Sequence, residues 1–151
     1  MLQSKTKRVG DEFLTLEVKN PPLAQIMLDL VDFVRIEFHK DVVMTMIHRT
    51  QAEQWKLYEK TDGPKTKRIS PHMHWNAVDL RDRIYTPKEK QKITAYLQSH
   101  YDGSNRMAKL GNGSRTCWLH KIKGQAMHFH IQYSGPLVYV FNEGMTITGG
   151  K

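Results

Sequence analysis

The sequence contains a single cysteine, Cys117, so no internal disulfide can form and a disulfide-stapled secreted scaffold is excluded. No apolar run approaches the roughly 18 residues that a membrane span requires, and we expect no membrane-spanning segment. The basic N-terminus is not followed by the apolar stretch of a secretory signal peptide, so none is predicted. Internal repeats and low-complexity tracts are also missing, which favours one ordinary globular unit.

The charge of the chain is strongly positive. Its 151 residues include 23 Lys and Arg against 15 Asp and Glu, which gives a formal net charge of +8 at pH 7. This excess favours an anionic partner, which could be nucleic acid, a membrane surface or an anionic cell-wall polymer. Trp55, Trp75 and Trp118 are not regularly interleaved with basic residues, as they would be in a stacking platform for single strands. Nucleic acid is therefore the least favoured of these partners.

Hydrophobic periodicity predicts an α+β fold. After Pro21 and Pro22, apolar residues recur at helical spacing as far as Phe38. Two further helices are predicted, from Thr50 to about Lys60 and from Pro87 to about Tyr101. Strands are predicted at 41–48, 77–80, 116–122, 126–133 and 137–141, and loops at 60–70 and 102–114. Together these elements predict a small antiparallel sheet flanked by about three helices.

The N-terminal end of the chain differs from the rest in composition. Residues 1–10 are polar and basic. We predict that residues 1–20 form a loose basic segment, and that residues 21–151 form a single domain.

Histidines occur in two closely spaced pairs. In the predicted strand 126–133, alternation places His128, His130 and Gln132 on one face, with apolar residues on the other. The second pair is His72 and His74, and Asp79 follows shortly after it. Imidazole nitrogens and a carboxylate oxygen are the ligands that zinc prefers, so the pattern favours a metal site. The alternative is that these are ordinary surface or hydrogen-bonded core histidines.

The same residues carry a resemblance to a known family. The stretch Ser70-x-His72-x4-Ala77-x-Asp79 resembles the S-x-H-x-x-G-x-A-x-D signature of the LAS zinc metallopeptidases. That family contains D-Ala-D-Ala carboxypeptidases, bacteriophage L-Ala-D-Glu endopeptidases and the hedgehog fold, and the resemblance covers residues 41–133. It implies a hedgehog/DD-peptidase-like domain in which His72, Asp79 and the late His130 bind zinc. The glycine of the signature is replaced here, with Trp75 and Asn76 between the histidine pair and Ala77.

The resemblance also implies two catalytic residues. Arg49 follows the predicted strand 41–48, as in the family, where an arginine steadies the substrate carbonyl or the oxyanion. The general base of the family is an Asp or Glu shortly before the last histidine ligand. Here the residues three positions before His130 and His128 are Met127 and Gln125, and neither accepts a proton at neutral pH. His128 is the best substitute, because an imidazole takes up and releases protons near neutral pH.

Three further residues are candidates for contact with a substrate. Ser70 could hydrogen-bond the substrate, although a loop serine can also serve only as a turn residue. Trp75 could form a wall of the pocket or fill the core. Gln132 could support a ligand or be an exposed strand amide. His48 and His120 could also face the pocket.

These features predict a zinc-dependent peptidoglycan peptidase that hydrolyses a stem-peptide amide bond with a metal-activated water, in the manner of a phage or prophage endolysin. The expected partners are the stem peptide and the anionic wall surface. Such an enzyme would be cytoplasmic in the producing cell and act at the wall after release, or as part of a virion. Two alternatives remain: a non-catalytic zinc-binding structural or interaction module of the same fold, and a basic nucleic-acid-associated protein.

Overall fold

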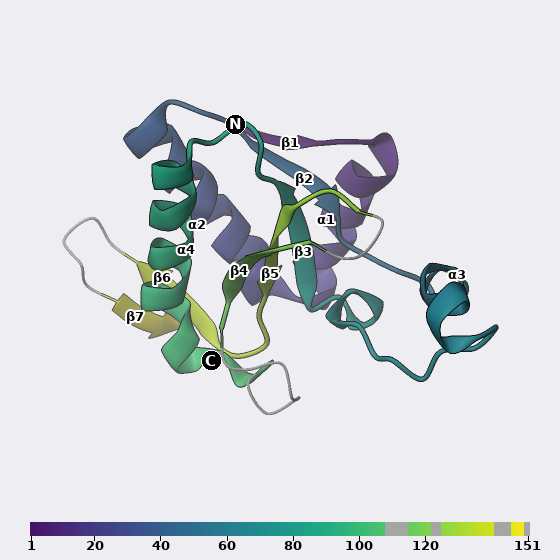
Figure 1. Ribbon diagram of the computed structural model, residues 1–151. Coiled ribbons are helices and arrows are strands. Elements are labelled where there is room, and N and C mark those ends of the chain that lie inside the picture. Colours follow the sequence, from purple (N-terminus) through teal and green to yellow (C-terminus); the bar gives the residue numbers. More distant parts are fainter. Residues whose placement is uncertain (108–114, 122–124, 141–145, 150–151) are drawn as a thin grey trace.

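A five-stranded mixed sheet lies at the centre of the fold (Figure 1). The computed structural model describes residues 1–107, 115–121, 125–140 and 146–149. The strands follow the order β1-β2-β3-β5-β4; β1 is parallel to β2 and the other neighbours are antiparallel. Their bounds are β1 (Leu2–Ser4), β2 (Val42–Met46), β3 (Ala77–Arg81), β4 (Cys117–His120) and β5 (His128–Gln132). A separate two-stranded sheet pairs β6 (Leu137–Val140) with β7 (Thr146–Gly149).

The helices begin at local capping signals. Their bounds are α1 (Lys7–Lys19), α2 (Pro21–Phe38), α3 (Gln51–Asp62) and α4 (Pro87–Tyr101), with short 3₁₀ helices η1 (Pro71–His74) and η2 (Asp102–Ser104). Thr50 and Glu53 form a reciprocal capping box at the start of α3, and Thr86 and Glu89 form another at α4. Each box satisfies backbone N–H groups that have no partner inside the helix.

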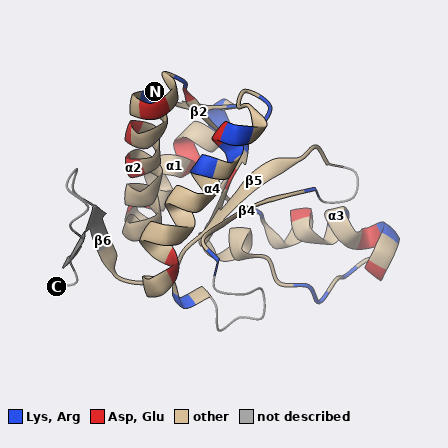
Figure 2. Cartoon of the chain, turned by 60° about the vertical axis from the view of Figure 1, so that its left-hand side comes forward, with Lys and Arg blue, Asp and Glu red and all other residues tan. Residues whose placement is uncertain are grey.

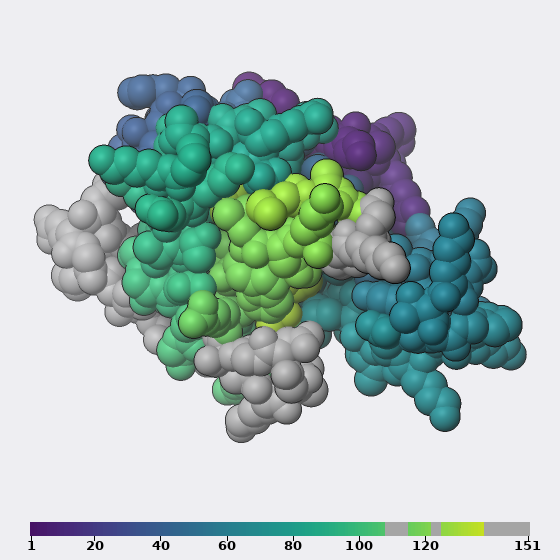
Figure 3. Space-filling view, in the orientation of Figure 1, coloured from purple at the N-terminus to yellow at the C-terminus, as the bar shows by residue number. Residues whose placement is uncertain are grey.

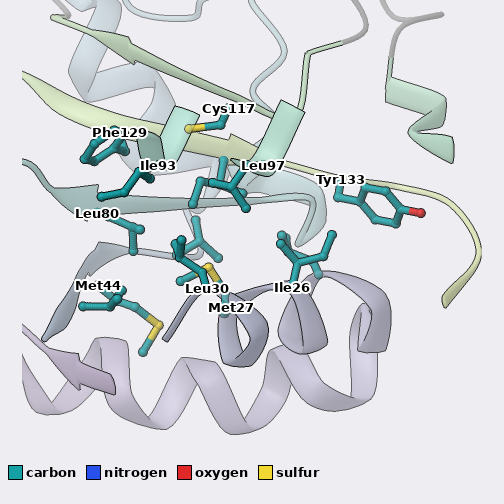
Figure 4. Close-up of a cluster of buried hydrophobic side chains, with 14 of the residues drawn as sticks. Ile26, Met27, Leu30, Met44, Leu80, Ile93, Leu97, Cys117, Phe129 and Tyr133 are labelled. Carbon is teal, nitrogen blue, oxygen red and sulfur yellow. The ribbon is translucent and has the colours of Figure 1, made fainter. Parts of the chain in front are cut away.

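The hydrophobic core lies between the sheet and the helices α2 and α4 (Figure 4). Leu80 of β3 and Phe129 of β5 point to this face, and both are almost completely buried. Leu30 of α2 and Ile93 of α4 pack in the same cluster. Because side chains alternate along a strand, the residues between the core positions point to the opposite face of the sheet. That opposite face carries the polar residues discussed below.

The predicted helices and strands are confirmed over residues 21–101, and the class is α+β as predicted. The sheet is mixed rather than antiparallel, because β1 adds to its edge in parallel with β2. There are four α-helices in the described ranges instead of about three. The predicted loop 102–114 begins with η2, and its residues 108–114 lie outside the described residues. No helix in the described part is long and apolar enough to cross a membrane.

The prediction of a loose segment over residues 1–20 was wrong, since β1 and α1 occupy most of it. Val9 and Leu16 have helical spacing, and both are buried against the core. The positive charge of Arg8 is compensated in the fold, because Arg8 forms ion pairs with Glu12 at 2.8 Å and with Glu53 at 2.7 Å. The apolar spacing outweighs the basic composition, and the segment folds as part of the domain.

The order of this segment can be tested with two leucines of α1. Leu16 is fully buried and Leu14 is 65% exposed. Leu16→Ala should lower the free energy of unfolding by about 2–5 kcal/mol, because it leaves a cavity in the core. Leu14→Ala, the matched control, should change it by less than about 0.5 kcal/mol. Urea denaturation measures both, and equal small effects would mean that α1 does not belong to the folded core.

Candidate metal centre

The strand register brings several polar and aromatic side chains together on the face opposite the core. Asp79 of β3 is directly paired with His130 of β5, and Arg81 is paired with His128. On the other side of β5, Trp118 of β4 is paired with His130 and His120 with His128. The separation of two residues within each strand keeps all of these side chains on one face of the sheet. The predicted alternation of β5 is therefore confirmed.

A tight turn adds His72 to this face. Ser70 caps η1 by accepting a hydrogen bond from the backbone N–H of His72 at 3.3 Å. Trp75 ends the turn in the left-handed conformation, with φ of 61°. The turn directs His72 toward Asp79, whereas His74 of the same turn is exposed. His72 and His74 therefore have different environments, although the sequence pairs them.

Asp79 lies between His72 and His130. The Oδ1 atom of Asp79 is 3.1 Å from Nε2 of His72 and 3.1 Å from Nδ1 of His130. All three ligand atoms lie within 4.8 Å of one another, and the exposed fractions of the residues are 2%, 3% and 5% for His72, Asp79 and His130. This is a buried group that could hold a metal ion, and it contains the three ligands predicted from the sequence.

The outer hydrogen bonds of the two imidazoles leave one nitrogen of each ring for Asp79. His72 Nδ1 is 3.0 Å from the carbonyl oxygen of Ile47 and donates to it, so Nε2 faces Asp79. His130 Nε2 is 3.1 Å from Oε1 of Gln132, and Nδ1 faces Asp79. Each facing nitrogen can donate a proton to the carboxylate or, without that proton, bind a metal. One divalent cation could bind all three ligand atoms.

The electrostatics of Asp79 suit a metal ligand. Burial alone would raise the pKa of Asp79, but the neighbouring rings of His72 and His130 outweigh burial and hold this pKa below its usual range. The carboxyl group is consequently ionised at neutral pH. An ionised carboxylate beside two imidazoles is a donor set that could hold a divalent metal ion.

A second group, on the other oxygen of Asp79, is arranged differently. Oδ2 of Asp79 is 3.4 Å from Nε2 of His128, and that nitrogen is 3.0 Å from Nε2 of His120. His128 Nδ1 donates to the carbonyl oxygen of Ala126 at 2.9 Å, and Trp118 Nε1 donates to His120 Nδ1 at 3.2 Å. His120 must then carry its proton on Nε2 and donate it to His128. Asp79, His120 and His128 could also hold a metal, although here one histidine nitrogen is already engaged by the other.

Burial, together with the nearby His130 and His128, lowers the pKa of His120 to about 4. His120 is therefore neutral at pH 7, which agrees with its role as a donor to His128. The sequence suggested only that His120 could face the pocket. In the sequence, Trp118 and His120 are two residues apart in a predicted strand, which indicates that they share a face of the sheet. The sequence does not show which strand is the neighbour, so the contact between His120 and His128 could not be predicted.

Arg49 lines a cavity of about 390 Å³ next to the metal-binding group. In the space-filling view, the segment around α3 forms a lobe beside the sheet, and Arg49 precedes this helix (Figure 3). The guanidinium donates to Gln54 at 3.0 Å and to Ser70 at 3.2 Å, and it has no carboxylate partner among the described residues. Burial lowers the pKa of Arg49, while the charge of Asp79 opposes this effect. Arg49 thus presents a positive charge beside His72.

The three predicted substrate contacts have different environments. Ser70 lines the same cavity as Arg49. Gln132 is fully buried and positions His130 instead of facing a cavity, and its Nε2 has no hydrogen-bond partner within the described ranges. Trp75 stacks on His48, with ring centroids 4.4 Å apart, and packs against the core. Trp75 lines neither the cavity of Arg49 nor the cavity that borders Asp79.

Comparisons of the chain with protein-family models, curated proteins and solved structures give no match. The fold and the site therefore define a class by their own features: an α+β domain with a buried His-Asp-His group on the open face of its sheet.

Metal binding can be tested with the two histidines of η1. The protein should bind one zinc ion per chain, and zinc at 100 times its dissociation constant should stabilise the fold by about 2.7 kcal/mol. His72→Ala should lose the bound zinc and this stabilisation, because it removes one ligand. His74→Ala should retain both, because His74 is exposed. Elemental analysis and thermal unfolding measure the effects. Stoichiometric zinc in folded His72→Ala would contradict the ligand assignment.

Proposed function

We propose that this protein is a zinc-dependent peptidase that hydrolyses a stem-peptide bond of peptidoglycan. The observation that supports it most is the convergence of His72 Nε2, Asp79 Oδ1 and His130 Nδ1 in a buried group beside the cavity of Arg49. The spacing of His72, Asp79 and Arg49 in the sequence resembles the LAS metallopeptidases, and the proposal follows that resemblance. Zinc is the preferred ion because of the two nitrogen ligands and one oxygen ligand.

Zinc, when bound, supplies a water molecule activated for attack on an amide, with a pKa near 7 instead of near 16. The residues of the chain hold and direct the substrate. Arg49 carries a permanent charge on the wall of the cavity and would stabilise the negative charge that develops on the carbonyl oxygen. Ser70 and Gln54 hold the guanidinium in place through hydrogen bonds to Nη1.

His128 is the proposed acid and base. Its Nδ1 proton is fixed on the carbonyl oxygen of Ala126, so its Nε2 is the atom that can accept a proton. Nε2 faces Asp79 and His120 next to the metal-binding group. The contact with His120 must open when Nε2 takes up a proton, because two N–H groups cannot face each other. His128 would then donate this proton to the amine that leaves.

We further propose an endolysin-like setting in a phage or prophage. The net charge of +8 suits an anionic wall surface. In such a setting the protein is made in the cytoplasm and acts at the wall after release, or acts as part of a virion.

One observation favours a second candidate, a non-catalytic zinc-binding module of the same fold. The residues that line the cavity of Arg49 include neither Asp nor Glu among those described. A carboxylate base of the kind that the LAS family uses is thus missing from this cavity. The two candidates differ in hydrolysis and agree in zinc binding.

Arg49→Ala should lower kcat/KM for release of amino groups from purified peptidoglycan by about 100- to 1,000-fold, because it removes the charge that stabilises the oxyanion. Zinc content should be unchanged, since Arg49 is not a ligand. Lys56→Ala is the matched control, because it removes an exposed positive charge from nearby α3. Unchanged kinetics in Arg49→Ala would exclude Arg49 from the mechanism.

His128→Ala should retain one zinc ion per chain and lose most of the hydrolysis, because His128 carries the proton without binding the metal. Zinc content and release of amino groups are measured on the same preparation. Loss of zinc from His128→Ala would instead make His128 a ligand. Absence of hydrolysis in zinc-loaded wild-type protein would favour the non-catalytic module.

A further inference from the structure

A second cavity, of about 420 Å³, borders the metal-binding group at Asp79. Asp79 and His128 form one wall of it. The remaining wall is formed by residues from several segments: Lys5, Thr45, Met46, Arg81, Asp82, Arg83, Gln125, Ala126 and Met127. The volume lies in the usual range for sites that bind small molecules. No sequence motif indicated this cavity.

The strand register explains why Arg81 lies beside the metal-binding group. Arg81 follows Asp79 by two residues in β3 and therefore lies on the same face of the sheet. Its direct neighbour in β5 is His128. Lys5 directly follows β1, and its backbone N–H donates to the carbonyl oxygen of Met44 in β2. The sheet thus places two cationic residues from distant parts of the sequence at this cavity.

The charges that line the cavity do not cancel. Arg81, Arg83 and Lys5 form no ion pair with any residue that the structure describes. Of the described residues that line it, two are acidic: Asp82, whose carboxylate is held by Lys90 at 2.7 Å, and Asp79, whose Oδ1 is shared by His72 and His130. Figure 2 shows Lys and Arg gathered around the first turns of α4. An anion that enters this cavity would meet three cations that are not paired with either carboxylate.

We propose that this cavity is an anion subsite in which Arg81, Arg83 and Lys5 hold a carboxylate of the bound substrate next to the metal centre. The identity of the ligand as a peptide substrate rests on the proposed function, whereas binding of the carboxylate itself does not. The cavity of Arg49 borders the same group at His72 and His130, whereas this cavity borders it at Asp79. A peptide that occupies both cavities would therefore carry its acidic group at the Arg81 end.

The test uses glutarate as the probe and its uncharged diamide, glutaramide, as the control ligand. Isothermal titration on zinc-loaded protein should detect glutarate and no glutaramide. Arg81→Gln and Lys5→Gln should each raise the dissociation constant of glutarate by at least about threefold, a large effect for a partly exposed charge. The double variant should raise it by more than about tenfold. Lys19→Gln, which removes an exposed charge at the end of α1, should leave it unchanged.

Equal affinity in wild type, Arg81→Gln and Lys5→Gln would overturn the subsite, as would an equal loss in Lys19→Gln. If Arg81→Gln does not fold, Arg83→Gln replaces it, because Arg83 is exposed.

Two peptides then separate the sources of the carboxylate. Acetyl-Ala-Glu-amide carries only a side-chain carboxylate and acetyl-Ala-Ala only a terminal one. The peptide whose binding depends on Arg81 identifies the source, and dependence of neither on Arg81 would overturn the substrate assignment.

Failure of the anion subsite can be distinguished from failure of the proposed peptidase function. The glutarate measurement is repeated on the His72→Ala variant, which should lack metal but keep the wall of this cavity. A loss of glutarate affinity caused by Arg81→Gln in both backgrounds supports the subsite, even if no peptide is hydrolysed. If Arg81→Gln weakens glutarate binding only in the metal-loaded protein, the anion subsite is not independent of the metal, and the proposal is overturned.

Discussion

The site depends on one constraint, the convergence of two imidazole nitrogens on the buried carboxylate of Asp79. The carbonyl oxygen of Ile47 and the amide oxygen of Gln132 lie within hydrogen-bond distance of the other nitrogen of each ring, on the far side. The near nitrogens of His72 and His130 are each 3.1 Å from Oδ1 of Asp79. A buried carboxylate is unfavourable without a nearby positive charge, which either protons on these rings or a metal ion can supply. The mutual distances of the three ligand atoms, more than the number of histidines, make this group a candidate for metal binding.

The fold separates stability from chemistry by the two faces of one sheet. Leu80 and Phe129 point to the helices and build the core. Asp79 and His130, their neighbours in the same strands, point to the opposite face, where a charged group costs no core packing. Two cavities border this group, with Arg49 on the wall of one and Arg81 on the wall of the other. The positive charges suit a substrate that is anionic or becomes anionic during the reaction.

The sequence predicted the elements and the central group better than it predicted their surroundings. The spacing of His72, Asp79 and His130 was informative, because a turn and a period-two strand place side chains by local rules. The environments of His120 and Arg81 depend on which strands are neighbours, and no local pattern shows this. Trp75 was misleading, because its proximity in sequence to His72 does not bring its ring to either cavity. The N-terminal segment was misjudged from its composition.

The most direct measurement is an anomalous diffraction experiment at the zinc edge on crystals of the protein purified in the presence of zinc. One peak is expected at about 2.0–2.2 Å from each of three atoms, His72 Nε2, Asp79 Oδ1 and His130 Nδ1. Such a peak would establish the centre on which the proposed peptidase depends. A peak between His120 and His128 instead, or no ordered zinc in well-diffracting crystals, would contradict the assignment.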